Sequence, residues 1–151
     1  GNNVIIKSFS HLEGTIIKNN VAIGPYARLR TGTSIFSGAK IGNFVETKKT
    51  SIQSNSKVNH LSYVGDTLIG RNSNIGAGTI TCNYDGSKKH KTKIKDNVFV
   101  GSNTSLVAPL TLQKNSVIGA GSVITKNVQK NSLSLTRSNQ IQIKNYKRKK
   151  K

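Results

Sequence analysis

The sequence of 151 residues contains no methionine, no tryptophan and a single cysteine, Cys82. One cysteine excludes an internal disulfide framework and fits a reducing compartment. Because the chain has no methionine to serve as an initiator, we expect it to be a piece of a longer protein. Aromatic residues are 5% of the chain, so a core built on large rings is not expected. The fold must instead bury many small aliphatic side chains.

Long apolar runs and acidic residues are also scarce. No segment approaches the length of a membrane span, and no secretory signal is present, so we expect a cytoplasmic protein with no membrane partner. The chain has five acidic residues and 24 lysines and arginines, which gives a net charge of +19. Such a surface attracts polyanions. We attribute most of this charge to a lysine-rich composition and expect no specific nucleic acid, because no binding motif or aromatic platform accompanies it.

In place of these features, the chain has a repeat of six residues. Aliphatic residues recur at steps of six, with a few steps of five, at Ile17, Ile23, Leu29, Ile35, Ile41, Ile52, Val58, Val64, Ile69, Ile75, Ile94, Val100, Leu106, Leu112, Ile118 and Ile124. The fifth residue of a six-residue unit, or hexad, is usually small or β-branched, as at Ala27, Thr33, Ala39, Val45, Ser56, Ser62, Ser73, Thr79, Val98, Thr104, Ser116, Ser122 and Val128. A helix, with a period of 3.6, cannot sustain this pattern.

The repeat predicts an all-β protein, a parallel β-helix in which three hexads close one triangular coil. The aliphatic residue points inward, and each coil buries its faces by stacking on the next. Glycine often holds the second place, as at Gly42 and Gly76, which we interpret as corners that need unusual backbone dihedrals. The period does not give the handedness, although parallel crossovers in general are right-handed.

The repeat is interrupted once, after Thr81, and resumes at Ile94. Residues 82–92 are therefore expected to leave the prism as a loop. Such loops often carry function, although the Asp85-Gly86 pair is equally typical of a plain solvated hairpin. We divide the chain into a coiled domain at 1–128, with the loop at 82–92, and a C-terminal extension at 129–151 with a basic, disordered end.

Two features of the repeat indicate chemistry. Arg30 and Lys48 are eighteen residues apart, so they should stack one coil apart, at about 4.8 Å between strands. Stacked cations repel each other unless a bound phosphate lies between them, or unless both side chains extend into solvent. His60 is third in its hexad and should point outward, which leaves a surface histidine or a functional one.

Five segments carry a resemblance to a known family: "PYARLRTGT", "IGNFVETKK", "NHLSYVGD", "IGAGTITCNYDG" and "VFVGSNTSLVAP". Together they resemble the C-terminal acetyltransferase domain of the bifunctional N-acetylglucosamine-1-phosphate uridyltransferase/glucosamine-1-phosphate N-acetyltransferase family, whose acetyltransferase half belongs to the hexapeptide-repeat acyltransferases. The resemblance implies a left-handed β-helix and a homotrimer. It also implies acetyl transfer from acetyl-CoA to the amine of glucosamine 1-phosphate, a step toward UDP-N-acetylglucosamine, peptidoglycan and lipopolysaccharide. The uridyltransferase half, which would need Mg²⁺, is absent from this chain, and no metal is implied here.

The resemblance also implies roles for single residues. His60 would be the general base, which suits a side chain whose ordinary pKa lies near the working pH. The sugar phosphate would be held by Arg30, Lys48, Tyr63, Asn74 and Lys89. Acetyl-CoA would lie along Ala77, Asn83, Tyr84, Ser102, Ala120 and Arg137. Glu46 is a weaker candidate for orienting His60 or the substrate amine. The tail after Arg137 departs from the family, so no contact with CoA is assigned beyond it.

Other functions remain open at this point. Another hexapeptide-repeat acyltransferase would share the fold. A metalloenzyme of the γ-class carbonic anhydrase type would need three histidines on zinc, and the chain has three, His11, His60 and His90. No two of them are closely spaced, and His90 lies among lysines that disfavour its protonated form. A nucleic-acid-binding module and a prism without a ligand are further alternatives.

Overall fold

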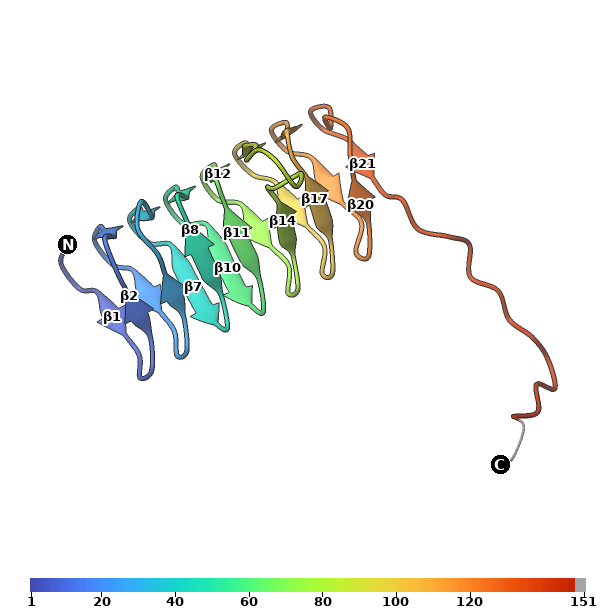
Figure 1. The fold of residues 1–151 in the computed structure, drawn as a ribbon, viewed down its shortest axis with the longest axis horizontal. Coiled ribbons are helices and arrows are strands. Elements are labelled where there is room, and N and C mark those ends of the chain that lie inside the picture. Colours follow the sequence, from blue (N-terminus) through green and yellow to red (C-terminus); the bar gives the residue numbers. More distant parts are fainter. Residues whose placement is uncertain (149–151) are drawn as a thin grey trace.

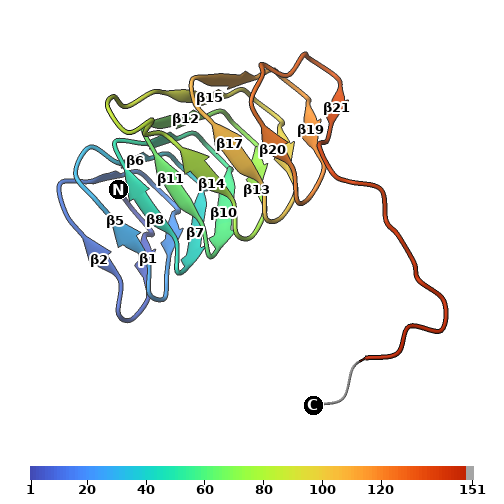
Figure 2. The ribbon, with the colours of Figure 1, turned by 45° about the vertical axis from the view of Figure 1, so that its right-hand side comes forward.

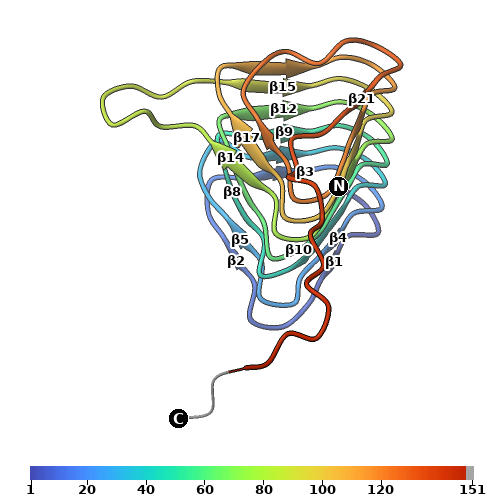
Figure 3. The same ribbon diagram turned by 90° about the vertical axis from the view of Figure 1, so that its right-hand side faces the viewer.

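The computed structural model describes residues 1–148 of the chain. The predicted disorder of the basic end falls partly on residues 149–151, which lie outside the described residues. The described chain winds into a stack of triangular coils whose sides are three parallel sheets (Figures 1 and 3). The predicted all-β parallel β-helix is thus confirmed, whereas its left-handed sense stays a prediction. No helix within residues 1–148 is long and apolar enough to cross a membrane.

Up to β20, the three sheets take every third strand in turn, because each coil contributes one strand to each side of the prism (Figure 2). Sheet A contains β1 (Ile5–Ile6), β4 (Ala22–Ile23), β7 (Lys40–Asn43), β10 (Lys57–His60), β13 (Asn74–Ile75), β16 (Phe99–Val100), β19 (Val117–Ile118) and β21 (Leu133–Ser134). Sheet B contains β2 (His11–Leu12), β5 (Arg28–Leu29), β8 (Glu46–Lys48), β11 (Tyr63–Gly65), β14 (Ile80–Cys82), β17 (Ser105–Val107) and β20 (Val123–Ile124). Sheet C contains β3 (Ile16–Ile17), β6 (Ser34–Ile35), β9 (Ser51–Ile52), β12 (Thr67–Ile69), β15 (Thr92–Ile94) and β18 (Leu110–Leu112).

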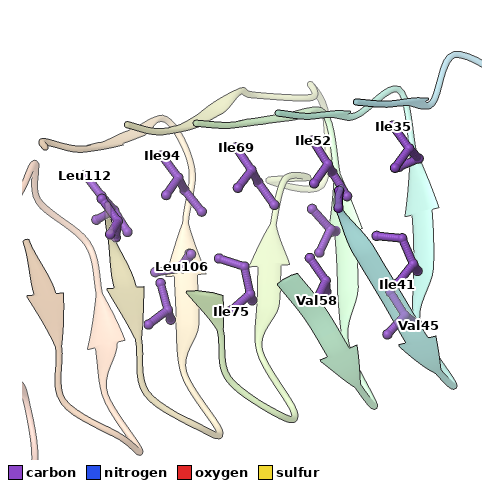
Figure 4. Close-up of a cluster of buried hydrophobic side chains, with 14 of the residues drawn as sticks. Ile35, Ile41, Val45, Ile52, Val58, Ile69, Ile75, Ile94, Leu106 and Leu112 are labelled. Atoms are coloured by element: carbon purple, nitrogen blue, oxygen red, sulfur yellow. The ribbon is translucent and has the colours of Figure 1, made fainter. Parts of the chain in front are cut away.

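The interior of the prism is the predicted column of aliphatic side chains (Figure 4). All the aliphatic positions of the repeat from Ile23 to Ile124 are buried, and Ile17 is partly buried against them. Every small fifth-position residue is buried as well. Burying one isoleucine, leucine or valine contributes about 1.5–3 kcal/mol, so stability accumulates coil by coil. The hexad pattern therefore identified the core correctly.

The interpretation of the second-position glycines was wrong for most of them. Gly42 and Gly76 do not have positive φ angles. A Cβ on Gly76 would lie 2.6 Å from the backbone nitrogen of Ser102, and one on Gly42 would collide with the carbonyl oxygen of Asn59. These glycines are needed because neighbouring coils approach closely. Left-handed φ angles occur instead at the fourth position, often on asparagine, as at Asn103 with φ 55°.

Two departures from regular coiling frame the candidate site. The chain between β14 and β15 leaves the prism at the corner between sheets B and C (Figure 3), as the break in the repeat predicts. At the C-terminal end, β21 pairs with β19, Leu133 opposite Val117. The coils therefore continue past residue 128, where the sequence analysis placed the end of the coiled domain, because a further strand still finds an edge to pair with.

Candidate active site

His60 lies at the corner between sheets A and B. It ends β10 opposite Asn43 of β7, and its side chain is exposed, as predicted. The ring nitrogen Nδ1 lies 2.8 Å from Oδ1 of Asn43. An amide oxygen only accepts, so this contact places the hydrogen on Nδ1 and leaves Nε2 of the neutral ring as the basic nitrogen. The sequence analysis missed Asn43, although its position one coil before His60 could have indicated it.

A line of small residues continues from His60 along the same corner. Backbone N–H groups link it from coil to coil: Gly78 donates to the His60 carbonyl at 3.2 Å, and Gly121 donates to that of Ser102 at 2.8 Å. In order, the line is His60, Ala77, Ser102 and Ala120. The end is marked by Arg137, whose Nη2 would lie 3.6 Å from a Cβ on Gly119. Four of the residues expected to bind acetyl-CoA therefore form one strip beginning at His60.

The other two residues expected to bind acetyl-CoA lie elsewhere on the chain. Asn83 follows β14 at the opposite edge of sheet B, where it is 7% exposed. Its amide donates to Oδ2 of Asp66 at 2.5 Å. Tyr84 is exposed in the loop, and its hydroxyl donates to the carbonyl of Gly86 at 2.6 Å. A single chain does not bring Asn83 and Tyr84 to the strip.

Three cations gather at the corner between sheets B and C, and we call Arg30, Lys48 and Lys89 the cation cluster. Arg30 and Lys48 stack one coil apart, as predicted, with the Arg30 N–H donating to the carbonyl of Thr47 at 2.9 Å. The loop brings Lys89 beside Lys48. A side-chain hydrogen bond with Lys89, and then the positive charges of Lys89 and Arg30, lower the pKa of the Lys48 ammonium. These like charges favour an anion at this corner.

Glu46 compensates part of this charge. Its Oε1 accepts from Nη1 of Arg30 at 2.9 Å, and its Oε2 lies 3.9 Å from Nη1 of Arg28. The Glu46 carboxylate thus contacts these two arginines rather than His60. The suggestion that Glu46 orients His60 therefore gives way to Asn43, because Glu46 begins a strand of sheet B whereas Asn43 faces His60 on sheet A.

Tyr63 and Asn74, the remaining residues assigned to the sugar phosphate, lie on different sheets. Tyr63 is half-buried at the start of β11, and a Cβ on Gly65 would lie 2.6 Å from its hydroxyl. Gly65 pairs with Lys48, so the absence of a side chain there lets the Tyr63 hydroxyl approach the cation cluster. Asn74 begins β13 on sheet A, next to Lys57 in register. Of the five predicted residues, Asn74 alone lies away from sheet B and its loop.

The three histidines are separated. His11 begins β2, His60 ends β10, and His90 lies in the loop with Nε2 2.6 Å from Oδ2 of Asp85. The contact of His90 with Asp85 is one that the sequence analysis did not indicate. Within residues 1–148, no group of three or more histidine, cysteine or acidic side chains is placed to hold a metal ion.

Comparison with known sequences identifies close relatives. Residues 91–126 match the family model for bacterial transferase hexapeptides (six repeats). The chain is 58% identical over 146 residues to the bifunctional protein GlmU of Thermosipho melanesiensis, covering 97% of this chain and 32% of that protein. It is 55% identical over 148 residues to GlmU of Cellvibrio japonicus, covering 98% and 33%. The chain thus spans about one third of the length of these relatives.

Comparison with solved structures supports the fold. A crystal structure of PerB from Caulobacter crescentus, in complex with CoA and GDP-perosamine, matches with a TM-score of 0.68 at 17% identity, covering 75% of this chain and 52% of that one. UDP-N-acetylglucosamine acyltransferase from Campylobacter jejuni matches with a TM-score of 0.53 at 16% identity, covering 86% and 71%. The resemblance stated from the sequence is confirmed: the chain is closely similar, over nearly its whole length, to about one third of the bifunctional GlmU proteins.

Proposed function

We propose that this chain transfers the acetyl group of acetyl-CoA to the amine of glucosamine 1-phosphate. The observation that carries the proposal is the pairing of His60 with Asn43 at the corner between sheets A and B, together with the cation cluster at the other corner of sheet B. The chain therefore carries a base and an anion site, the two kinds of group that an acceptor with an amine and a phosphate needs. The similarity to GlmU proteins and the likeness to acyltransferase structures support the same reaction.

In this reaction His60 acts through Nε2. It takes a proton from the 2-amine of the sugar, and the nitrogen lone pair attacks the carbonyl carbon of the thioester. A carbon–nitrogen bond forms, the carbon–sulfur bond breaks, and the CoA thiolate takes up a proton to leave as the thiol. Asn43 holds the imidazole in the tautomer that keeps Nε2 basic.

The strip from Ala77 to Ala120 would take the acyl donor. Small side chains leave room for an extended pantetheine arm along the corner, and Arg137 at the end of the strip suits the phosphates of CoA. Backbone N–H groups near the thioester would stabilise the oxygen as it gains charge, and Ser102 would donate to the departing thiolate. The site holds only organic co-substrates in this scheme.

A homotrimer would complete the site. Asn74 lies on sheet A, whereas Asn83 and Tyr84 lie at the corner of sheet B that is far from the strip. These residues are therefore on different sides of one prism. Ligand sites are concave, whereas a single prism wall is open. A closed threefold ring would set one chain's sheet A and another chain's loop beside the same ligand. This division of residues supports a site at the boundary between subunits.

The test is to measure CoA released from acetyl-CoA with and without glucosamine 1-phosphate. We expect release to depend on the acceptor, and the product to be N-acetylglucosamine 1-phosphate by mass spectrometry. Glucosamine without phosphate should react poorly, because it cannot use the cation cluster. Faster acetylation of an amino sugar that lacks the phosphate would favour the alternative of another hexapeptide-repeat acyltransferase and would contradict the proposal.

A further inference from the structure

The loop between β14 and β15 folds on itself as a hairpin. Its two arms meet at an antiparallel bridge between Tyr84 and Lys89. The backbone N–H of His90 donates to the carbonyl of Asn83 at 2.8 Å, which closes the hairpin at its base. The base is also tied to the prism, because the buried Asn83 amide donates to Asp66. The position of Lys89 on the second arm is therefore set by how the hairpin closes.

Asp85 closes the tip of this hairpin with both carboxylate oxygens. Oδ1 accepts from the backbone N–H groups of Ser87 at 2.8 Å and Lys88 at 2.6 Å. Oδ2 lies 2.6 Å from Nε2 of His90, which crosses from one arm to the other. Donation from the Lys88 and Ser87 backbone and from His90 holds the pKa of the Asp85 carboxyl well below its usual range. The carboxylate thus stays ionised throughout the physiological range.

This bracing has to oppose a repulsion. The pKa of Lys48 is lowered first by a side-chain hydrogen bond with Lys89, then by the positive charges of Lys89 and Arg30 and, more weakly, of Lys49. A flexible loop would swing Lys89 away from this corner toward solvent, because exposed like charges gain by separating. Lys89 stays beside Lys48 because the hairpin that carries it is closed at its base and its tip.

The placement of acidic residues points to the same corner. The chain has five acidic side chains, and three of them act here. Asp85 braces the tip of the hairpin, Asp66 anchors its base, and Glu46 pairs with Arg30. In a chain with a net charge of +19, these carboxylates do not neutralise the corner, but each one fixes an element that carries a cation of the cluster.

We propose that Asp85 and His90 are positioning residues, whose contact across the hairpin holds Lys89 beside Lys48 so that the cation cluster is ready for a phosphate. Neither residue touches the acceptor in this scheme. The proposal rests on the proposed function only for the identity of the anion, a sugar phosphate. The geometry of the hairpin and its effect on Lys48 can be measured without any turnover.

The experiment follows the titration of Lys48 by NMR of the lysine side chains in the full chain, with Lys48→Arg to assign the signal. Lys89→Ala gives the reference pKa of Lys48 without its neighbour. We expect His90→Ala and Asp85→Ala to raise the pKa of Lys48 toward that reference. His90→Gln should restore the wild-type value, because a glutamine amide can still donate to Asp85. Lys88→Ala, which removes a charge from the same tip, is the matched control and should leave Lys48 unchanged.

Two results would overturn the positioning role. One is a Lys48 pKa in His90→Ala and Asp85→Ala equal to that of the wild type. The other is a His90→Gln variant that behaves like His90→Ala, because the cross-hairpin hydrogen bond would then not be the cause. Circular dichroism of each variant reports whether the coils are intact.

A kinetic arm connects the positioning role to the reaction. In His90→Ala we expect the KM for glucosamine 1-phosphate to rise about tenfold, with kcat and the KM for acetyl-CoA within about twofold of wild type. Equal losses for both substrates would contradict the role. If the wild-type chain transfers no acetyl group at all, the proposed function fails, whereas the Lys48 titration still decides whether the hairpin positions Lys89.

Discussion

At the residue scale, the site depends on two side chains whose neighbours define their chemistry. His60 owes its basic Nε2 to Asn43, which accepts from Nδ1 across one coil. Lys48 owes its lowered pKa to Lys89 and Arg30. The His60–Asn43 pair and the stacking of Arg30 on Lys48 follow from the coils, because residues seventeen or eighteen apart in the chain face one another at the spacing of adjacent strands, whereas Lys89 comes from the loop.

Asn43→Ala should lower kcat about tenfold, the order of loss seen when a partner that orients a functional histidine is removed. The affinity for acetyl-CoA should be unchanged, since the strip beyond Ala77 is not altered. Steady-state kinetics and calorimetric titration measure the two effects separately. Asn55, in the turn between β9 and β10, is a control: Asn55→Ala should leave kcat unaffected, and a similar loss there would argue against a specific role for Asn43.

Arg30→Ala and Lys48→Ala should each lower the affinity for glucosamine 1-phosphate about tenfold or more, because a charged hydrogen bond to phosphate is lost. Binding of acetyl-CoA should change little, since neither residue lies on the strip. Separate titrations of the two ligands give this comparison. Equal weakening of both ligands would mean that the cation cluster is not the acceptor's phosphate site.

The affinity for inorganic phosphate should fall as the pH rises through the lowered pKa of Lys48. The sign follows because phosphate binds the charged ammonium, and that ammonium deprotonates at a lower pH than an ordinary lysine. Without phosphate, the unfolded chain binds more protons in this alkaline window, so folding stability should rise there with pH. Calorimetry from neutral pH upward measures the affinity. Lys48→Arg should remove this alkaline loss, and a wild-type affinity that stays constant would be the opposing result.

At the scale of single elements, the coils are set by two kinds of local requirement. Aliphatic side chains fill the interior, and second-position glycines allow adjacent coils to approach closely. A Cβ on Gly76 would meet the backbone of Gly101 and Ser102 at 2.6–2.7 Å, whereas a Cβ on Gly119, at the same hexad position, would meet the Leu135 Cβ at 2.9 Å and no backbone atom as closely. A methyl group added at these two glycines should therefore have different consequences.

Gly76→Ala should destabilise the protein by about 1–3 kcal/mol or more, because backbone atoms at 2.6–2.7 Å cannot move without breaking ladder hydrogen bonds. Gly119→Ala should cost less, because its nearest neighbours are side-chain atoms, and the only one within 3 Å is the Leu135 Cβ at 2.9 Å, just after the last strand of the stack. Denaturant unfolding of both variants measures the difference. Equal losses would show that close backbone approach is not what selects glycine at Gly76.

The sequence was most informative where structure is local. The hexad period identifies the buried aliphatic column and the stacking of Arg30 on Lys48, because both depend only on counting residues around a coil. It could not place Glu46 on Arg30 or Asp85 on His90, since those contacts depend on side-chain rotamers and on the path of an irregular loop. Motifs alone likewise group Asn74 with Arg30, although they lie on different sheets.

At the scale of the whole molecule, the candidate site residues lie on different sides of one chain, which leads to a prediction about assembly. A monomer leaves Asn74, the strip and the loop facing different directions, and a threefold ring is the symmetry that we propose to unite them. Lys89 lies beside Lys48 of its own chain, so within a ring the cation cluster of one chain would serve the amine site of either the same chain or its neighbour.

Mixing inactive His60→Ala chains with inactive Lys89→Ala chains distinguishes these arrangements. If Lys89 of one chain and His60 of another act on the same substrate, mixed rings should regain activity. Some subunit boundaries would then carry an intact Lys89 from one chain and an intact His60 from the other. Subunit exchange is verified by mass spectrometry of differently labelled chains. With exchange established, a mixture that stays inactive would mean that His60 and Lys89 act within one chain.

The most direct measurement is the rate of CoA release by the His60→Ala variant of the full chain, with glucosamine 1-phosphate and acetyl-CoA both present. We predict a rate lower by on the order of a hundredfold or more, because the amine loses its general base, while calorimetry shows acetyl-CoA still bound. Near-wild-type turnover by this variant at neutral pH would contradict the assignment of His60 as the base.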